Sequence, residues 1–399
     1  MEYYELLAKS PPQLRNPLCW RLPGAGAEGK TLLYNGAAAD AGKEASILGA
    51  KRVLLLIGQH VLRTSGGAAV CAALEQADID YDVYTGISSE PHFEDVVPDL
   101  QRAASSRRYE AVIGAGGGSV MDMAKLAAHA GGGTLEEILE ANDFSRQPLP
   151  LILLPTTSGT GSEISPYAVL TVDGKKVFYS SPNLLPTVAL VDPLLTVSSP
   201  PRITAATAFD AMTHALEGAM ARPTAYSEAL AVESTAQILR YLPRAIADPG
   251  DLEARYSLAM ASVMGMMSYA TGGGLYAHSI SYILTLEKEQ PHGAGCGFAL
   301  PYTMAFNAPY IQPLLQKLSA RCQETMQGKA DVVRQIQSAC VQSGLPASLQ
   351  ALGYTTADIP RLAGKLLSQY ARKNNPRQLT PEDAALLFEA MYAGTVRYF

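Results

Sequence analysis

The stretch AVIGAGGGSVMDMAK, residues 111–125, joins a short apolar run to a glycine-rich turn and then to a helical pattern. The apolar run is typical of a buried strand. Glycines let a backbone come close to a pyrophosphate, and the N–H groups at the start of a helix point toward such an anion. Glycine runs also serve tight packing of a strand on a helix, so this stretch alone leaves both interpretations open. The spacing GxGxxG is not met, because Ser119 stands where its last glycine belongs.

Three more apolar runs in the first half of the chain are expected to be buried strands: Arg52–Ile57, Leu151–Leu154 and Val188–Val191. Each ends in glycine, proline, threonine or Asp-Pro, and helix-like stretches lie between them. Alternating strands and helices predict βαβ units and a parallel sheet. The first half is therefore expected to be an α/β domain.

A hydroxyl-rich segment, PTTSGTGSE at residues 155–163, follows one of these strands. Its hydroxyls and its two glycines suit hydrogen bonding to a ribose or a diphosphate. A solvated turn has a similar composition, but a turn of that kind rarely needs so many hydroxyls directly after a buried strand. The segment therefore favours contact with a ligand.

The character of the sequence changes near Ser198. Pro200-Pro201 makes a stiff junction, and the rest of the chain holds long helical patterns with few β-branched runs. Two domains are also the default for a chain of 399 residues. We expect an α/β dinucleotide-binding domain with a parallel sheet at residues 1–198 and an all-α domain at residues 199–399.

Composition indicates a folded protein and excludes several classes of function. Charged residues make up 17% of the chain and the formal net charge is −6, so neither disorder nor a basic nucleic-acid surface is expected. Residues 1–30 show no secretory signal, which predicts a cytoplasmic location. The charge-free segment Ser257–Leu286 is long enough for a membrane span, but GGG at residues 272–274 interrupts it. Two helices buried in a soluble domain fit it better, and no membrane partner is expected.

The cysteines are odd in number, widely spaced and free of any CxxC pair: Cys19, Cys71, Cys296, Cys322 and Cys340. This pattern predicts neither a disulfide framework nor a zinc ribbon. In a cytoplasmic protein such thiols are expected to be small buried hydrophobic side chains.

Three histidines and one aspartate of the second half suggest a metal site: Asp210, His214, His278 and His292. Asp210 and His214 are four residues apart in a helical pattern, so both side chains lie on one face and can chelate one ion. Such a pair alone is more often a surface contact, and a lone histidine is more often a core residue bonded to a carbonyl. Together, in a domain with so little charge, they favour a shared divalent ion, Fe²⁺ or Zn²⁺, with an open coordination position.

These motifs together resemble the iron-containing alcohol dehydrogenase family, whose fold is related to that of dehydroquinate synthase. The resemblance runs from about Lys30 into the final third of the chain. It is carried by GGGSVMD at 116–122, LPTTSGTGSE at 154–163, LLPTVALVDP at 184–193, DAMTHALE at 210–217, and His278 followed by PHG at 291–293.

The resemblance implies roles for the matching residues. As metal ligands it implies Asp210, His214, His278 and His292. Around the pyrophosphate it implies Gly117, Gly118 and Ser119, with Asp122 supporting that loop. Along the cofactor cleft it implies Thr156, Thr157 and Thr160. It also implies NAD or NADP as cofactor, and a homodimer or larger assembly in which N-terminal strands pair across subunits.

One departure from the family pattern lies in the metal domain. Many members have a second histidine four residues after the one that matches His278, where it helps to pass a proton, whereas this chain has Tyr282. A phenol on the same helix face can relay a proton or simply pack, and both interpretations stay open. The change also reshapes the pocket, so an anionic short aldehyde such as phosphonoacetaldehyde or sulfoacetaldehyde is an alternative substrate.

The other departure follows the strand Arg52–Ile57. Members that prefer NAD often place an aspartate there, which repels the 2′-phosphate of NADP, whereas this chain has Gly58-Gln59. Electrostatic rejection of NADP is therefore absent. Gln59, with His60 and Arg63 nearby, could serve either cofactor.

We therefore expect hydride transfer between a nicotinamide in the cleft between the domains and a small alcohol or aldehyde, with the metal as Lewis acid. One alternative is a dehydroquinate synthase-like lyase, but that chemistry needs basic residues around a substrate phosphate, and Ser257–Leu286 has none. Another is a catalytically inert cofactor-binding relative, against which the complete metal set argues. Motifs alone do not choose a substrate within so broad a family.

Overall fold

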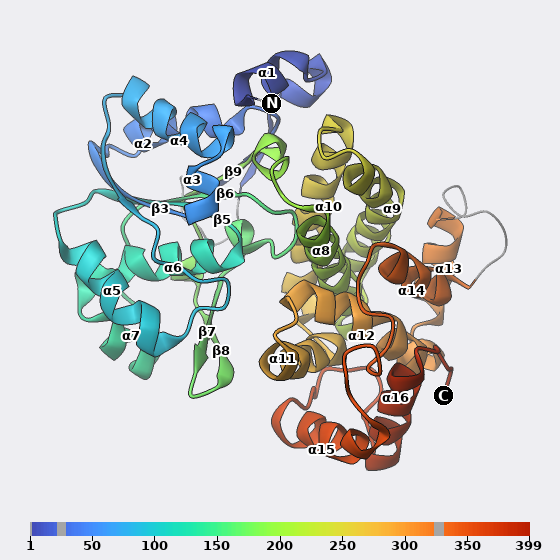
Figure 1. Ribbon diagram of the computed structural model, residues 1–399. Helices are drawn as coiled ribbons and strands as arrows, with labels where there is room; N and C mark the ends of the chain where they lie inside the picture. The colour runs from blue at the N-terminus through green and yellow to red at the C-terminus, as the bar shows by residue number, and fades with distance from the viewer. Residues whose placement is uncertain (1, 22–28, 323–330) are drawn as a thin grey trace. The chain divides into compact units, whose positions relative to one another are not determined.

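The computed structural model describes residues 2–21, 29–322 and 331–399. The chain divides into two compact units, one made of Met1–Thr157 and Gly161–Ser199, the other of Ser158–Thr160 and Pro200–Phe399. The first unit combines a mostly parallel sheet with helices, and the second is helical (Figure 1). The predicted fold class is therefore confirmed.

In the described part of the first unit, seven strands form a sheet in the order β1-β2-β9-β6-β5-β3-β4. All neighbours are parallel except β1 and β2, which are antiparallel. The strands are β1 (Leu18–Arg21), β2 (Lys30–Leu33), β3 (Arg52–Ile57), β4 (Asp80–Tyr84), β5 (Ala111–Gly116), β6 (Leu151–Pro155) and β9 (Val188–Val191). A separate antiparallel hairpin joins β7 (Tyr167–Val172) to β8 (Lys175–Ser180).

The four strands predicted from apolar runs are β3, β5, β6 and β9, and nearly all of their residues are buried. They lie in the middle of the sheet, where helices cover both faces and every side chain needs an apolar partner. Figure 1 shows α2 (Ala41–Ile47) and α4 (Ser65–Gln76) on one face, with α5 (Phe93–Ser105) and α6 (Gly118–His129) on the other. The edge strands β1 and β4 were not predicted, because β1 is only four residues long with a mostly exposed surface, and two aspartates interrupt the apolar pattern of β4.

The order in which the chain adds strands to the sheet changes direction between β3 and β5. From β3 the chain proceeds outward to β4, whereas from β5 it proceeds to β6 and β9 on the other side. Ligands of parallel α/β sheets bind outside the carboxyl ends of the strands at such a switch point. The remaining helices of this unit are α1 (Tyr3–Lys9), α3 (Gln59–Leu62) and α7 (Leu135–Ala141).

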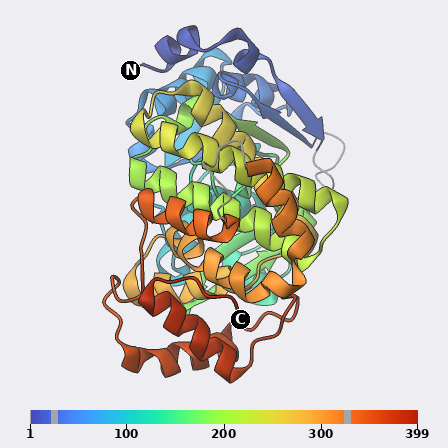
Figure 2. The ribbon, with the colours of Figure 1, turned by 90° about the vertical axis from the view of Figure 1, so that its right-hand side faces the viewer.

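The second unit is built around three long helices that pack against one another: α8 (Pro201–Ala221), α9 (Ala225–Ala247) and α10 (Leu252–Gly272). Next to α8 lie α11 (Tyr276–Lys288) and α12 (His292–Asn307). The chain continues through α13 (Gln312–Cys322), α14 (Val332–Gln342), α15 (Ile359–Gln369) and α16 (Pro381–Ala393). The last two helices pack side by side and are orange-red to red in Figures 1 and 2. One hydrophobic core runs through this unit.

Among the described residues, no helix is long and apolar enough to cross a membrane. The charge-free segment is shared between α10, which ends at Gly272, and α11, which begins at Tyr276. Gly273 between them has a φ of +77°, a conformation that glycine adopts without steric cost. The interpretation of this segment as two buried helices is confirmed.

Candidate metal centre and cofactor cradle

The glycines of the first motif serve two different purposes. A Cβ added at Gly114 would lie 2.6 Å from Cβ of Ala124, and one added at Gly116 would lie 2.5 Å from Cβ of Val120. These two glycines let α6 pack closely on β5. At Gly117 the nearest atom to an added Cβ is Oγ1 of Thr157, 3.7 Å away, which is ordinary contact. Packing therefore does not require glycine at 117, whereas a closely bound phosphate would.

Most of the predicted cofactor residues gather at the carboxyl ends of β3, β5 and β6. The N–H of Gly58 donates to the carbonyl of Ala115 (3.2 Å), and the N–H of Thr156 donates to the carbonyl of Gly116 (2.9 Å). Gly117 caps the start of α6, whose first N–H groups have no partner within the helix. Gln59, Gly118 and Thr157 directly follow Gly58, Gly117 and Thr156 in the chain and lie at the same strand ends.

Two predicted residues differ from the expectation in detail. The Ser119 hydroxyl donates to the carbonyl of Ser89, so the group that this residue offers an anion is its backbone N–H. Thr160 belongs to the second unit, whereas Thr156 and Thr157 belong to the first. The threonines of this segment are therefore divided between the two units.

Asp122 is buried and holds the hydroxyl-rich segment onto α6. Its carboxylate accepts hydrogen bonds from the Ser162 hydroxyl (2.6 Å) and from the N–H of Val169 (3.0 Å). Lys125, for which the sequence pattern indicates no role, lies one turn later and is fully buried. Its ammonium donates to the carbonyls of Ser165 (3.0 Å) and Tyr167 (2.5 Å), and burial lowers its pKa to about 8. Both residues position backbone beside the cradle, in line with the supporting role expected of Asp122.

Three helices of the second unit bring potential metal ligands together. One ligand atom from each of Asp210 (α8), His278 (α11), His292 and Cys296 (both α12) lies within 4.8 Å of each of the others. Nε2 of His292 is 3.8 Å from Oδ1 of Asp210. His214 is outside this group of four, although its ring centroid is 4.7 Å from that of His278. Cys296 was not among the predicted ligands.

Glu217 fixes the orientation and the tautomer of His278. Its carboxylate accepts hydrogen bonds from Nδ1 of His278 (2.6 Å) and from the N–H groups of Leu275 (2.5 Å) and Ala277 (2.7 Å). The Nε2 lone pair of His278 is thereby left for a ligand, as in the carboxylate–histidine–metal arrangement. Burial, followed by the neighbouring His214, lowers the pKa of His278 well below its usual value, so the imidazole is neutral. The role of Glu217 was missed, although it stands in a quoted motif.

Ser281 does the same for His292. The Ser281 hydroxyl donates to the carbonyl of His292 (2.6 Å) and so accepts from Nδ1–H of the same residue (3.0 Å). That leaves Nε2 unprotonated. His292 is the first residue of α12. The glycines around it are helical, and an added Cβ at Gly293 would lie 2.2 Å from the Ala206 carbonyl oxygen of α8. They permit close helix packing rather than a turn.

The buried polar atoms of this cluster test whether the residues fit a cation. Oδ1 of Asp210, Nδ1 of His214 and Nε2 of His278 are buried and have no hydrogen-bond partner in the part of the chain that the structure describes. Leaving such an atom unsatisfied costs about 1–3 kcal/mol, and buried polar groups in native proteins rarely lack a partner. A carboxylate oxygen and neutral imidazole nitrogens are ligands for a first-row divalent ion. The residues therefore fit a divalent cation.

Tyr282 lies one turn after His278 on α11 and is buried. Its ring stacks on His292, with centroids 5.2 Å apart and planes 8° apart. Burial raises the pKa of its phenol well above the usual value, so the hydroxyl keeps its proton. Cζ of Arg372 lies 6.0 Å from the centre of the same ring.

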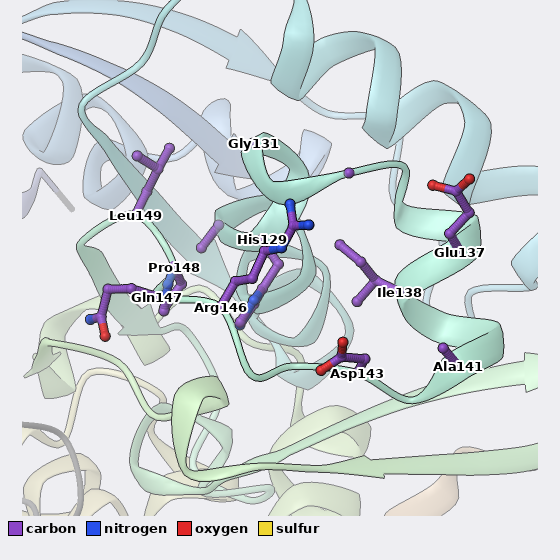
Figure 3. Close-up of a pocket in the computed structure, with 12 residues that line it drawn as sticks. His129, Gly131, Glu137, Ile138, Ala141, Asp143, Arg146, Gln147, Pro148 and Leu149 are labelled. Carbon is purple, nitrogen blue, oxygen red and sulfur yellow. The ribbon is translucent and has the colours of Figure 1, made fainter.

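A cavity of about 560 Å³ lies elsewhere on the first unit and is lined by residues such as His129, Glu137, Asp143 and Arg146 (Figure 3). It is at the end of α6 opposite the cradle, about 18 Å along a helix of 12 residues. Local structure already engages several of its polar groups: Glu137 closes a capping box with Thr134, and Asp143 accepts from the N–H of Ser145. Its lining includes none of the residues predicted to contact the cofactor.

The expectation for the cysteines was partly wrong. Cys296, Cys322 and Cys340 are buried, but Cys19 is exposed and Cys71 is only half-buried. Cys19 lies on β1, which is an edge strand among the described strands of the sheet.

Comparisons with known proteins agree with this architecture. A long-chain-alcohol dehydrogenase from Geobacillus thermodenitrificans is 32% identical over 372 residues, which cover 88% of this chain and 92% of the relative. An alcohol dehydrogenase from Oenococcus oeni has the same fold, with a TM-score of 0.83 at 24% identity over 90% of this chain and 97% of the other. A sulfoacetaldehyde reductase from Bifidobacterium kashiwanohense, solved in complex with NAD⁺, has a TM-score of 0.79 at 27% identity over 90% and 95% of the two chains.

These similarities place the protein in the class of alcohol dehydrogenase oxidoreductases. Residues 29–193 match the family described as iron-containing alcohol dehydrogenase, and residues 204–392 match the C-terminal part of the Fe-containing alcohol dehydrogenase family. The chain belongs to the iron-containing alcohol dehydrogenase family. The resemblance stated from the motifs is confirmed.

Proposed function

We propose that the protein is a metal-dependent, NAD(P)-linked alcohol dehydrogenase or aldehyde reductase that acts on a small alcohol or aldehyde. The observation that carries this proposal is the meeting of Asp210, His278 and His292. Among the described residues, the buried Oδ1 of Asp210 and Nε2 of His278 have no hydrogen-bond partner. The glycine at 117, which packing does not require, supports a nicotinamide dinucleotide at the switch point of the sheet. Fe²⁺ and Zn²⁺ both suit the donor set.

Several side chains of the cluster are oriented for metal binding and proton transfer. Glu217 and Ser281 hold the two imidazoles with Nε2 available, and His214 lies beside them on α8. When bound, the cation supplies a Lewis acid for an alcohol or carbonyl oxygen, and the nicotinamide accepts or supplies hydride. The Tyr282 phenol, stacked on His292, is the side chain that we propose to pass the alcohol proton.

A chelation experiment tests this function. The protein is loaded with Fe²⁺ or Zn²⁺, and nicotinamide absorbance is followed with short alcohols and aldehydes and with both NAD and NADP. Stripping the metal should abolish turnover while leaving cofactor binding intact, and Asp210→Asn should behave like the stripped protein. Full activity in a verified metal-free sample would reject the role of the metal. A metal-loaded sample that is silent with every substrate would favour an inert relative, and turnover without net cofactor reduction would favour the lyase alternative.

A second candidate substrate class, a short anionic aldehyde, is favoured by one specific residue. Arg372 is partly exposed, and its guanidinium lies beside Tyr282. Nε of Arg372 donates to the Ser279 hydroxyl (2.8 Å), whereas its two terminal nitrogens form no hydrogen bond with the described part of the chain. A guanidinium with free donors suits a sulfonate or phosphonate. The similarity to a sulfoacetaldehyde reductase points the same way.

Paired substrates separate these two candidates. Sulfoacetaldehyde and propanal are aldehydes of similar size that differ in charge. If Arg372 binds the anion, Arg372→Gln should raise the KM for sulfoacetaldehyde roughly tenfold or more, about 1.4 kcal/mol, and leave the KM for propanal unchanged. Equal changes for both aldehydes would assign Arg372 to packing around Tyr282 and Ser279 instead.

A further inference from the structure

The thiol of Cys296 lies inside the candidate metal centre. Cys296 is one turn after His292 on α12 and is completely buried. Its Sγ lies 3.5 Å from Nε2 of His292, the atom that Ser281 leaves unprotonated. It also lies within 4.8 Å of the ligand atoms of Asp210 and His278.

These distances fit a single ion. Zinc binds nitrogen, oxygen and sulfur ligands at about 2.0–2.3 Å, so two ligands of one ion are at most about 4.6 Å apart. The four ligand atoms need only small side-chain movements to surround one cation. Within the described residues, the buried Oδ1 of Asp210 and Nε2 of His278 have no hydrogen-bond partner, which independently indicates a ligand at this point.

The usual explanation for a buried cysteine does not apply here. Cys340 is also buried, but it belongs to the hydrophobic core of the helical unit, where a thiol behaves as a small apolar side chain. Cys296 instead lies next to an imidazole and a carboxylate. A purely apolar role would not need sulfur among these polar groups.

We infer that Cys296 is a ligand of the same cation, so that the donor set contains a thiolate beside Asp210, His278 and His292. The inference rests on the proposed function, because it assumes that the cluster holds a metal. Binding converts the thiol to a thiolate and releases one proton to solvent for each cation bound. Thiolate ligands select soft or borderline ions, so this chain favours zinc over the iron that gives its family its name.

Cobalt spectroscopy tests the inference without relying on activity. The whole protein is stripped of metal and loaded with Co²⁺, and the intense sulfur-to-cobalt charge-transfer band in the near ultraviolet is recorded. The band should be present in the wild-type protein, absent in Cys296→Ser and unchanged in the control Cys340→Ala. In competition with a chelator, Cys296→Ser should lose zinc affinity by more than the roughly 10–100-fold that removal of an outer contact costs.

The outcomes separate this inference from the proposed function. Stoichiometric cobalt binding without the charge-transfer band, or a band that survives in Cys296→Ser, would overturn the thiolate ligand while leaving the metal site in place. Failure of the wild-type protein to bind cobalt, zinc or iron at all would overturn both. Circular dichroism of each variant shows whether it is folded before metal binding is compared.

Discussion

At the scale of single residues, hydrogen bonds decide what each candidate group can do. His278 and His292 have the same imidazole side chain. In both, Nδ1–H donates a hydrogen bond, to Glu217 in one case and to Ser281 in the other. Each ring therefore presents Nε2 with a lone pair. The neighbouring hydrogen-bond acceptors therefore determine which nitrogen of each histidine is available to bind a metal.

Glu217 should tune metal affinity although it does not belong to the cluster of four. A glutamine at this position has one acceptor oxygen for three N–H donors, so His278 or a backbone N–H loses its partner. We expect Glu217→Gln to weaken metal binding roughly 10–100-fold. Competition with a chromophoric chelator measures the change. An affinity equal to that of wild type would show that Glu217 contributes only to packing.

Two glycines of one motif should respond differently to the same substitution. Gly117→Ala should leave thermal stability near wild type but raise the Kd for NAD roughly tenfold or more, about 1.4 kcal/mol, because the added methyl occupies the space of a phosphate. Gly114→Ala should instead lower the free energy of unfolding by about 1–3 kcal/mol, because its Cβ meets Ala124 and Leu153. Calorimetric melting and NAD titration distinguish the two effects. Unchanged NAD affinity in Gly117→Ala would argue against the cradle.

At the scale of elements, close helix packing places the metal ligands. An added Cβ at Gly265 of α10 would lie 2.5 Å from the carbonyl oxygen of Ala211, and one at Gly297 of α12 would lie 2.5 Å from Cβ of Phe209. Small residues let both helices approach α8, which carries Asp210. The far end of α11 is held differently, by charge.

Glu287, near the end of α11, connects that helix to α15. It accepts hydrogen bonds from Arg361 (2.7 and 3.1 Å) and from Lys365 (3.0 Å). Burial acts to raise the pKa of this carboxyl, but the hydrogen bonds and charges of the two cations outweigh it and hold the pKa below 4.5. A carboxylate with a depressed pKa stabilises the fold above the pKa of the unfolded chain, and this stability is lost as the pH falls through the folded value.

Glu287→Gln should therefore lower stability in a pH-dependent way. At pH 7 we expect a loss of about 1–3 kcal/mol, since a charged hydrogen-bonding partner is removed from a side chain that is 19% exposed. The difference should shrink as the pH falls below 4.5 and the wild-type carboxyl becomes protonated. Thermal unfolding of both proteins between pH 7 and pH 3 measures this. A difference that stays constant with pH would rule out a charge-based contribution.

At the scale of the whole molecule, the two candidate sites lie in different compact units. The cradle is formed by the ends of β3, β5 and β6, whereas the ligand cluster is formed by α8, α11 and α12. Each ligand should therefore stabilise its own unit, by about 2.7 kcal/mol at a free concentration one hundred times Kd.

Hydrogen exchange resolved by segment can test this separation. Zinc should slow amide exchange in α8, α11 and α12, and NAD should slow it around residues 114–121 and 156–157. Each ligand is added alone to the stripped protein. The internal reference is α7, which lies near the end of α6 opposite the cradle and belongs to the other unit from the ligand cluster. Protection by zinc confined to the first unit would contradict the assignment of the metal site.

The sequence by itself determined the fold class, the central strands and the family. Buried parallel strands are apolar along their whole length, so a local pattern is sufficient to predict them. The glycine-rich cradle directly follows β5 in the chain, so it could be predicted from the same stretch of sequence. Four metal-ligand candidates were also predicted, because a carboxylate and imidazoles are conspicuous in a segment with little charge, and three of them, Asp210, His278 and His292, lie in the cluster. The edge strands were not predicted, because β1 is too short to show a pattern and the aspartates of β4 resemble those of loops.

Only the tertiary structure decided what depends on distant neighbours. In the sequence, nothing distinguishes Cys296 from Cys340 as a potential ligand. Packing of α12 against α8 and α11 brings Cys296 close to Asp210 and His278. The roles of Glu217 and Lys125 likewise depend on partners 40 to 61 positions away along the chain. The pattern of apolar residues along a helix predicts which face is buried. It does not predict which polar atoms of distant residues will contact that face.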